Sequence, residues 1–344
     1  MLPLGQLLSV AIAATAPDTT SLAVAVDSSK HEIVIRVGPF DVPAMEMHEM
    51  TGMQADMGMP GHEAMAQDSP LFRFDWPVDG WARGYRVALV DAHGRSLPRR
   101  LLHHMLIVNF DRRQLLYPML ERLLGVGAET DDVTLPRTIG IPVRRGMVMG
   151  IYVGWHNESM EALDGVSLEL TVQWLPTNQN PTPVSVLPLY MDANLTVGVS
   201  NAFDVPPGHI EKSWSFTMPV SGRLLGVGGH LHDYGSAVRL EEPARGRTLI
   251  TLLARRDSGG RVDGLRRKLF GVRGEGLKLS AGHTYRVVGV YDNPTGILRR
   301  DAAMAHMVGL FVPEDLARWP AVDWSDPVIQ RDLAGLGIAG RSKE

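Results

Sequence analysis

The chain reads VSLELTVQW from Val166 to Trp174. Apolar and polar residues alternate along it, which is the period of a β-strand with one buried face. The same kind of pattern returns at 33–37, 84–90 and 285–291, with Gly- and Pro-rich turn signals between the segments. Many short strands punctuated in this way indicate stacked antiparallel sheets. We therefore predict an all-β protein.

The 344 residues are enough for about two domains. The segment 176–183 is rich in Pro, Asn and Thr and is the best candidate for a linker. We predict one β-sandwich domain at 21–176, a second at 184–313, and an irregular tail at 314–344. A single helix is predicted at 115–124.

Composition excludes several functional classes. The net charge is −4 and no basic stripe is present, so nucleic acid is not an expected partner. The absence of cysteine excludes disulfides, cysteine zinc sites and thiol nucleophiles. Residues 1–16 form a short apolar run ending in small residues, which is typical of a signal peptide, although no Lys or Arg precedes Lys30. We expect a secreted or periplasmic protein with no stable membrane insertion.

The segment 44–67 has an unusual composition. It holds seven of the 17 methionines, and its glycines and Pro60 argue against one long helix. Thioether sulfur selects Cu(I), so this loop is predicted to be a weak copper-collecting arm, with a simple insertion as the alternative. The residues concerned are Met45, Met47, His48, Met50, Met53, Met57, Met59, His62 and Met65.

Three histidine motifs stand out among the 12 histidines. His230 and His232 are two residues apart, so on a strand both rings point to one face and can meet at one ion. His103 and His104 are adjacent, and in a regular strand they would point to opposite faces. Sharing a metal therefore requires a bulge or a strand end there. The third motif is His156, which follows a strand-like run.

The types of donor favour copper over other metals. Imidazole binds copper well, and methionine sulfur prefers Cu(I) to harder ions. No acidic cluster adjoins these histidines in the sequence, which argues against calcium or magnesium. A non-haem iron site that uses Asp233 or Asp292 as its carboxylate is the alternative.

The motifs also occur in the order of a known family. The sequence HHML at 103–106 resembles the paired-histidine motif of the peptidylglycine and dopamine hydroxylating copper monooxygenases. His156, followed by GVSLELT at 165–171, is similar to that family's third histidine. The sequence HLH at 230–232 and the later Met304 are similar to its His-x-His pair and its methionine.

This resemblance to the ascorbate-dependent copper type II monooxygenases spans about 71–312, in a divergent member without cysteine. It implies two tandem jelly-roll-like sandwiches facing across a cleft, two coppers per chain, and ascorbate as the reductant. It also implies hydroxylation of a C–H bond of a small molecule or peptide with O₂. The implied ligands are His103, His104 and His156 for an electron-storing copper, and His230, His232 and Met304 for the catalytic copper that binds O₂.

The chain departs from this family where the substrate would bind. The peptide-amidating members hold the substrate carboxylate with an arginine two residues before the His-x-His pair, where this chain has Gly228. His306 and Val308 replace an asparagine and a tyrosine. A peptidylglycine substrate is therefore not expected. A non-catalytic copper protein, for storage, delivery or sensing, is the alternative function.

Neighbouring residues have competing interpretations. On a strand, Met304 and His306 share one face, while Met307 points to the core. His306 and Tyr234 would lie near the second copper, where they could contact the substrate or the ligands. A merely packed histidine and a turn tyrosine are the simpler interpretations.

Overall fold

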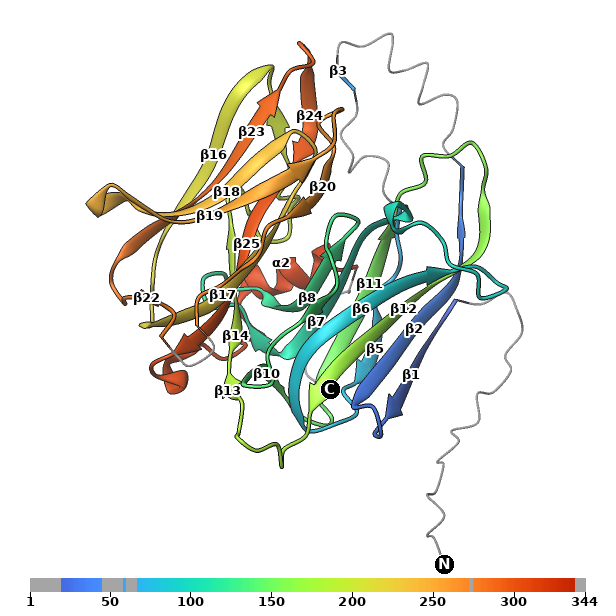
Figure 1. Cartoon of the computed structure of the whole chain (residues 1–344), viewed down its shortest axis with the longest axis horizontal. Coiled ribbons are helices and arrows are strands. Elements are labelled where there is room, and N and C mark those ends of the chain that lie inside the picture. The colour runs from blue at the N-terminus through green and yellow to red at the C-terminus, as the bar shows by residue number, and fades with distance from the viewer. Residues whose placement is uncertain (1–19, 45–57, 60–66, 272–274, 338–344) are drawn as a thin grey trace, which may run out of the picture.

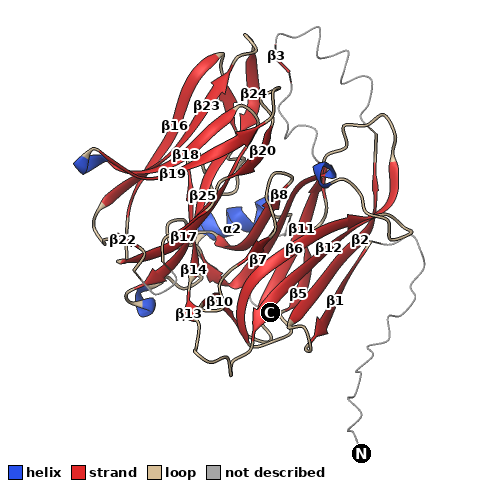
Figure 2. Cartoon of the chain, viewed as in Figure 1, coloured by secondary structure: helices blue, strands red, loops and turns tan. Residues whose placement is uncertain are grey.

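The computed structural model describes residues 20–44, 58–59, 67–271 and 275–337. Within these ranges the chain consists almost entirely of strands, as Figure 1 and Figure 2 show, and the predicted all-β class is confirmed. None of the helices in these ranges is both long and apolar enough to cross a membrane. The predicted signal peptide lies outside the described residues, as does every methionine and histidine of the predicted copper-collecting arm except Met59.

Two sheets form the first half of the described chain. The larger has the order β1-β2-β12-β6-β10-β13 with β9 beside β6, and the smaller has the order β4-β11-β7-β8 with β5 beside β11. The strands are β1 Ser21–Asp27, β2 Glu32–Val42, β4 Gln67–Asp68, β5 Phe72–Asp75, β6 Gly80–Val90, β7 Leu102–Arg113, β8 Leu120–Gly127, β9 Val133–Thr134, β10 Ile139–Val143, β11 Val148–Trp155, β12 Leu163–Leu175 and β13 Val184–Ser185.

The segment Val166–Trp174 lies in β12, at the centre of the larger sheet between β2 and β6. Val166, Leu168, Leu170 and Val172 have no exposed surface and belong to the same core as Ile107 of the smaller sheet. Complete burial of such side chains contributes about 1.5–3 kcal/mol each. Their alternation with polar residues thus fixes which face of the larger sheet turns inward.

Three sheets form the second half. Their orders are β14-β25-β17-β21 with β22 beside β17, β16-β23-β18-β19-β20, and β15-β24-β3. The strands are β3 Gly58–Met59, β14 Leu187–Asp192, β15 Phe203–Val205, β16 Gly208–Thr217, β17 Gly222–Leu231, β18 Gly235–Glu242, β19 Arg247–Arg256, β20 Val262–Leu265, β21 Lys268–Leu269, β22 Leu277–Leu279, β23 Thr284–Asn293, β24 Leu298–Ala303 and β25 Ala305–Pro313.

The buried apolar residues separate into two main cores. One draws its members from 33–186 together with Leu225, and the other from 189–311 together with Leu115. The chain passes from the first set of sheets to the second between β13 and β14. Figure 1 shows the two sets side by side, with the helix α2 (Pro327–Gly335) between them. We refer to them as the first and the second sandwich.

The predicted helix at 115–124 is wrong. Residues 115–119 form a turn, and from Leu120 onward β8 pairs with β7. The reason is visible in the sequence, since Pro118 lies inside the expected helix. Proline there has no N–H to donate and clashes with the preceding turn.

The tail, predicted as irregular, contains the only α-helix of the described residues. Asp326 caps α2 by accepting a hydrogen bond from the Val328 N–H, and Pro327 occupies the first turn. An acidic cap followed by proline is a standard helix start. Ile329 and Leu333 are fully buried in a small cluster with residues of β7 and β8. The helix therefore covers the outer face of the smaller first-sandwich sheet.

A buried ion pair fixes this helix, and its removal should be costly. Asp332 accepts from Arg122 at 2.6 Å and from the backbone N–H of Leu120 at 2.9 Å. The Asp332→Ala variant leaves the Arg122 charge buried without its partner, so we expect a loss of about 3–5 kcal/mol in the free energy of unfolding. Urea titration followed by circular dichroism measures it.

The matched control is Glu169→Ala, which breaks the exposed pair of Glu169 with Arg36 (3.1 Å). Exposed pairs are worth about 0–1 kcal/mol, so this variant should unfold almost as the wild type does. Equal losses in the two variants would contradict the structural role assigned to α2.

Candidate metal centre

The paired histidines stand at the start of β7, where its pairing with β11 is irregular. Gly154 lies opposite His104 and Trp155 opposite Leu102, so His103 has no partner in the ladder. This bulge lets the two adjacent rings approach each other, and their centroids are 4.8 Å apart. Gly154 leaves room for two side chains, because an added Cβ would lie 2.5 Å from Asp68 Oδ1 and 2.9 Å from His104 Nε2.

His156 follows the last residue of β11. Its backbone N–H donates to the Leu101 carbonyl oxygen at 2.9 Å, which ties it to the start of β7. The side chain is buried, its ring centroid is 6.4 Å from that of His103, and its Nε2 lies 3.7 Å from Glu158 Oε1. The first predicted group is therefore gathered at one end of a sheet, with His156 farther from His103 than His104 is.

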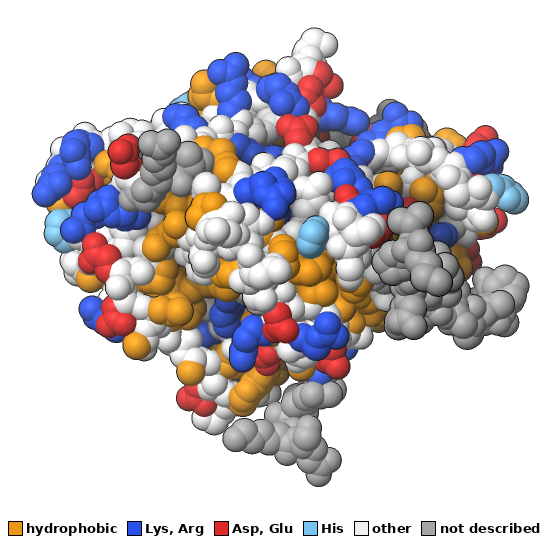
Figure 3. All heavy atoms as spheres, turned by 60° about the horizontal axis from the view of Figure 1, so that its bottom comes forward, with side chains coloured by type: hydrophobic (Ala, Val, Ile, Leu, Met, Phe, Trp, Pro, Cys, Tyr) orange, Lys and Arg blue, Asp and Glu red, His pale blue; other side chains and the backbone are white. Residues whose placement is uncertain are grey.

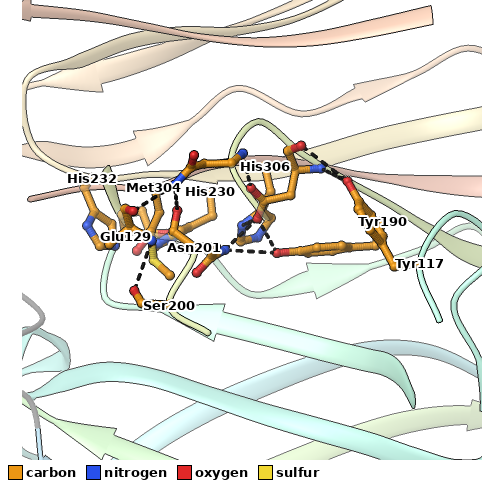
Figure 4. Close-up of polar contacts among 12 residues, drawn as sticks. Tyr117, Glu129, Tyr190, Ser200, Asn201, His230, His232, Met304 and His306 are labelled. Carbon is orange, nitrogen blue, oxygen red and sulfur yellow. Dashed lines mark hydrogen bonds and ion pairs between the residues drawn. The ribbon is translucent and has the colours of Figure 1, made fainter. Parts of the chain in front are cut away.

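The second predicted group lies at the end of β17. His230 stands opposite His306 of β25, and His232 follows the last residue of β17. The ring centroid of His230 is 4.8 Å from that of His232 and 5.1 Å from that of His306. Met304 lies between β24 and β25, and Figure 4 shows its side chain beside His230 and His232.

Strand alternation separates the two candidate methionines. Met307 is fully buried in the core of the second sandwich. Met304, His306 and Val308 instead line a cavity. The structure thus places Met304, and not Met307, beside the histidines.

The two predicted groups lie next to each other across the junction of the two sandwiches. The ring centroids of His103 and His232 are 6.1 Å apart, although these residues belong to different sandwiches. The junction of the two sandwiches therefore forms the candidate centre. We call the following six residues the imidazole cluster: His103, His104, His156, His230, His232 and His306.

A carboxylate that no sequence motif indicates holds His230. Glu129, from the loop after β8 in the first sandwich, lies 2.6 Å from His230 Nδ1 and also accepts from the Thr130 hydroxyl at 3.0 Å. Burial raises the pKa of Glu129, but the charge of His230 and its hydrogen bond outweigh burial and lower that pKa to about 2. Glu129 is therefore ionised, and it is 101 residues away from His230 in the chain.

A second carboxylate lies against the first group. Asp68 Oδ1 is 3.1 Å from His104 Nε2. Carboxylates that hold one nitrogen of an imidazole orient the other toward a metal in many proteins. The absence of acidic residues next to the histidines in sequence was thus no guide to their surroundings in space.

His306 lies in a polar network at the edge of the cluster. Burial, reinforced by the charge of His230, lowers the pKa of His306 to about 3, so its ring is neutral near pH 7. Its Nδ1 is 4.0 Å from Asp192 Oδ2 and has no hydrogen-bond partner among the described residues. Asp192 in turn accepts from the Tyr190 hydroxyl at 2.7 Å and from Asn201 at 2.6 Å.

Tyr234 is a turn residue, which is the simpler of its two predicted roles. Its backbone is left-handed (φ 66°), and its N–H donates to the Gly260 carbonyl oxygen at 2.9 Å. The Arg299 guanidinium lies 5.2 Å from the centre of its ring. Asp233 accepts from the Val262 N–H at 2.9 Å. Both residues serve the turn between β17 and β18, and neither lines the cavity beside Met304.

The cavity beside the imidazole cluster has a volume of about 810 Å³. His104, His230, Met304 and His306 contribute to its wall, together with residues of both sandwiches and α2. Gly228 also lines it. The site is therefore open to a molecule of moderate size.

The donors are gathered but are not arranged as a finished metal site. Within the described ranges, no group of three His, Cys, Asp or Glu side chains is placed so that it could hold an ion as it stands. Methionine is not one of these four residue types, so Met304 is not counted. In the first group, the ring centroids of His103 and His156 are 6.4 Å apart, compared with 4.8 Å for His103 and His104. Ion binding would require a movement of these rings.

Comparison with known proteins adds no assignment. No protein-family model matches the sequence, and no curated protein matches it. Among solved structures, a recombinant peptide:N-glycanase F covers 81% of this chain and 96% of its own, with 7% identity and a TM-score of 0.40. PNGase F, a glycosylasparaginase from Flavobacterium meningosepticum, covers 83% of this chain and 99% of its own, with 9% identity and a TM-score of 0.40. A likeness at this level identifies neither family nor activity.

Proposed function

We propose that this protein is a copper-dependent monooxygenase that hydroxylates a C–H bond of a small organic molecule. One atom of O₂ enters the C–H bond and the other leaves as water, with two electrons and two protons supplied by a reductant such as ascorbate. The observation that carries the proposal is the meeting of the imidazole cluster and Met304 at a cavity between the two sandwiches. Copper, when bound, supplies the redox change and the activation of O₂.

The residues present fit copper in the chemistry of their donors. His103, His104 and His156 would hold one ion, and His230, His232 and Met304 the other. Since Glu129 holds His230 at Nδ1, the Nε2 atom is the one left to bind a metal. Asp68 Oδ1 lies 3.1 Å from His104 Nε2, so Nδ1 would be the atom that faces a metal.

The open space beside Met304 supports catalysis over storage. A copper store or carrier needs the ligands but no substrate cavity, whereas here about 810 Å³ adjoins the methionine. Gly228 contributes to that space, because an added Cβ would meet only the Arg267 side-chain carbons, at 3.8 and 3.9 Å. A side chain in that position would reduce the room for a substrate.

Copper stoichiometry tests the proposed ligands. The metal-free protein, titrated anaerobically with Cu(I), should bind two ions per chain. The double variant His230→Ala/His232→Ala should bind one, because only the first group of ligands is left. Elemental analysis after gel filtration, with ascorbate-dependent oxygen uptake measured in parallel, provides the readout.

The matched control is His209→Ala/His283→Ala, which removes two exposed imidazoles outside the imidazole cluster. It should still bind two coppers. Retention of two coppers after loss of His230 and His232, or failure of the wild type to bind copper at all, would exclude the proposed centre.

A further inference from the structure

The wall of the cavity is mainly apolar. Leu124 and Val126 of β8 contribute to it from the first sandwich, and Val308 and Leu310 of β25 from the second. Its volume of about 810 Å³ falls in the range of about 300–1,000 Å³ that is usual for small-molecule sites. Such walls bind a ligand chiefly by removing its apolar surface from water.

The opening of the cavity is apolar as well. Val199 and Leu269 both line the cavity, yet their exposed fractions are 64% and 54%, so they stand where it meets solvent. Exposed large apolar residues are uncommon in the described chain, which has seven of them, with exposed fractions from 39% to 64%. On the face drawn in Figure 3, apolar side chains gather among the charged ones. An apolar rim on an apolar cavity favours entry of an apolar molecule.

The three arginines that line the cavity are bonded to the protein itself. Arg122 pairs with Asp332, while Arg83 and Arg267 donate to backbone carbonyl oxygens. Lys268 is exposed at the rim, next to Leu269. With Gly228 next to the histidines, the described wall near Met304 offers no cationic clamp for a carboxylate.

We infer that the cavity binds an uncharged, predominantly apolar organic molecule, which is the substrate class of the reaction proposed above. Only the role of this molecule as a substrate rests on the proposed function. The binding itself needs no metal, because the walls and the rim are made by this chain alone. It can therefore be tested on the metal-free protein.

The test uses the neutral fluorescent probe N-phenyl-1-naphthylamine and the metal-free full chain. Probe fluorescence should rise and saturate on titration. The Gly228→Leu variant places a side chain on the face of β17 that carries His230, so it should weaken binding by at least about tenfold, while Gly228→Ala should change it little. No saturable binding, or equal binding to all three proteins, overturns the inference.

A second pair of variants keeps the test valid if Gly228→Leu does not fold. Leu269→Glu puts a charge at the rim, whereas Leu253→Glu changes a leucine with a similar exposed fraction (48%) that does not line the cavity. Only the first should weaken probe binding. A further variant, Lys268→Gln, should leave it unchanged. If the wild type bound an anionic probe more tightly than the neutral one, and Lys268→Gln lost this preference, the inference of an uncharged ligand would be overturned.

The two proposals fail in different ways. Probe binding in a protein that takes up no copper would leave the apolar site in place and remove the monooxygenase. Two bound coppers with ascorbate-dependent turnover, but no saturable probe binding, would leave the enzyme in place and remove the apolar substrate class.

Discussion

The Met304→Ile variant is expected to lose nearly all turnover while it keeps one tightly bound copper per chain. Isoleucine has a similar volume but no sulfur, so the change removes the thioether and little else. The backbone carbonyl of Met304 accepts from the Tyr291 hydroxyl, and this bond does not depend on the side chain. We expect a fall in turnover of at least about 100-fold, since even the loss of a residue behind a metal ligand costs 10–100-fold.

The chain supplies its own control three residues away. Met307→Ile makes the same chemical change in the core of the second sandwich, where the side chain is fully buried. It should cost less than about 1.5 kcal/mol in the free energy of unfolding and leave both coppers and turnover in place. Oxygen uptake with ascorbate, with copper content of the same samples, separates the two variants. Full turnover in Met304→Ile would remove this residue from the proposed chemistry.

The parts of this site that the sequence could predict are those set by local geometry. A period of two places His230 and His232 close together, and the same period turns Met304 and Met307 to opposite sides. Each of these two patterns spans only a few residues of the chain. The strands themselves follow from alternation, as β12 illustrates, because burial of one face is a local property of the sequence.

The parts that could not be predicted depend on how the two sandwiches pack. The distance of 6.1 Å between the rings of His103 and His232 is set by the junction, which has no sequence period. The bulge at His103 depends on the register between β7 and β11. Asp332 is an unremarkable acid in sequence, and its ion pair with Arg122 spans 210 residues.

Glu129 is the clearest example of a site residue that only the three-dimensional structure reveals, because it lies 101 residues from His230 in the chain. Its loop is held to the second sandwich by Arg267, which donates to the carbonyl oxygens of Asp131 and Asp132. Within the first sandwich, Arg99 donates to the Thr130 carbonyl oxygen at 2.8 Å. The loop thus carries a carboxylate from one sandwich to a histidine of the other.

The Glu129→Ala variant should therefore bind copper more weakly at the second group of ligands. Without its acceptor, His230 loses the bond that orients its ring, and affinity should fall by about 10–100-fold. Glu129→Gln should lie between the wild type and Glu129→Ala, because an amide oxygen can still accept from Nδ1 but carries no charge. Competition with a chromogenic Cu(I) chelator measures both affinities of each variant.

Asp68→Asn is the crossed control, because Asp68 lies against His104 of the first group. It should weaken the first copper and leave the second unchanged, which is the opposite of the pattern for Glu129→Ala. A general loosening of the junction between the sandwiches would weaken both ions in both variants. If each carboxylate acts through its own histidine, each variant weakens only the copper on its own side. This outcome therefore distinguishes a carboxylate that orients a ligand from one that stabilises the fold.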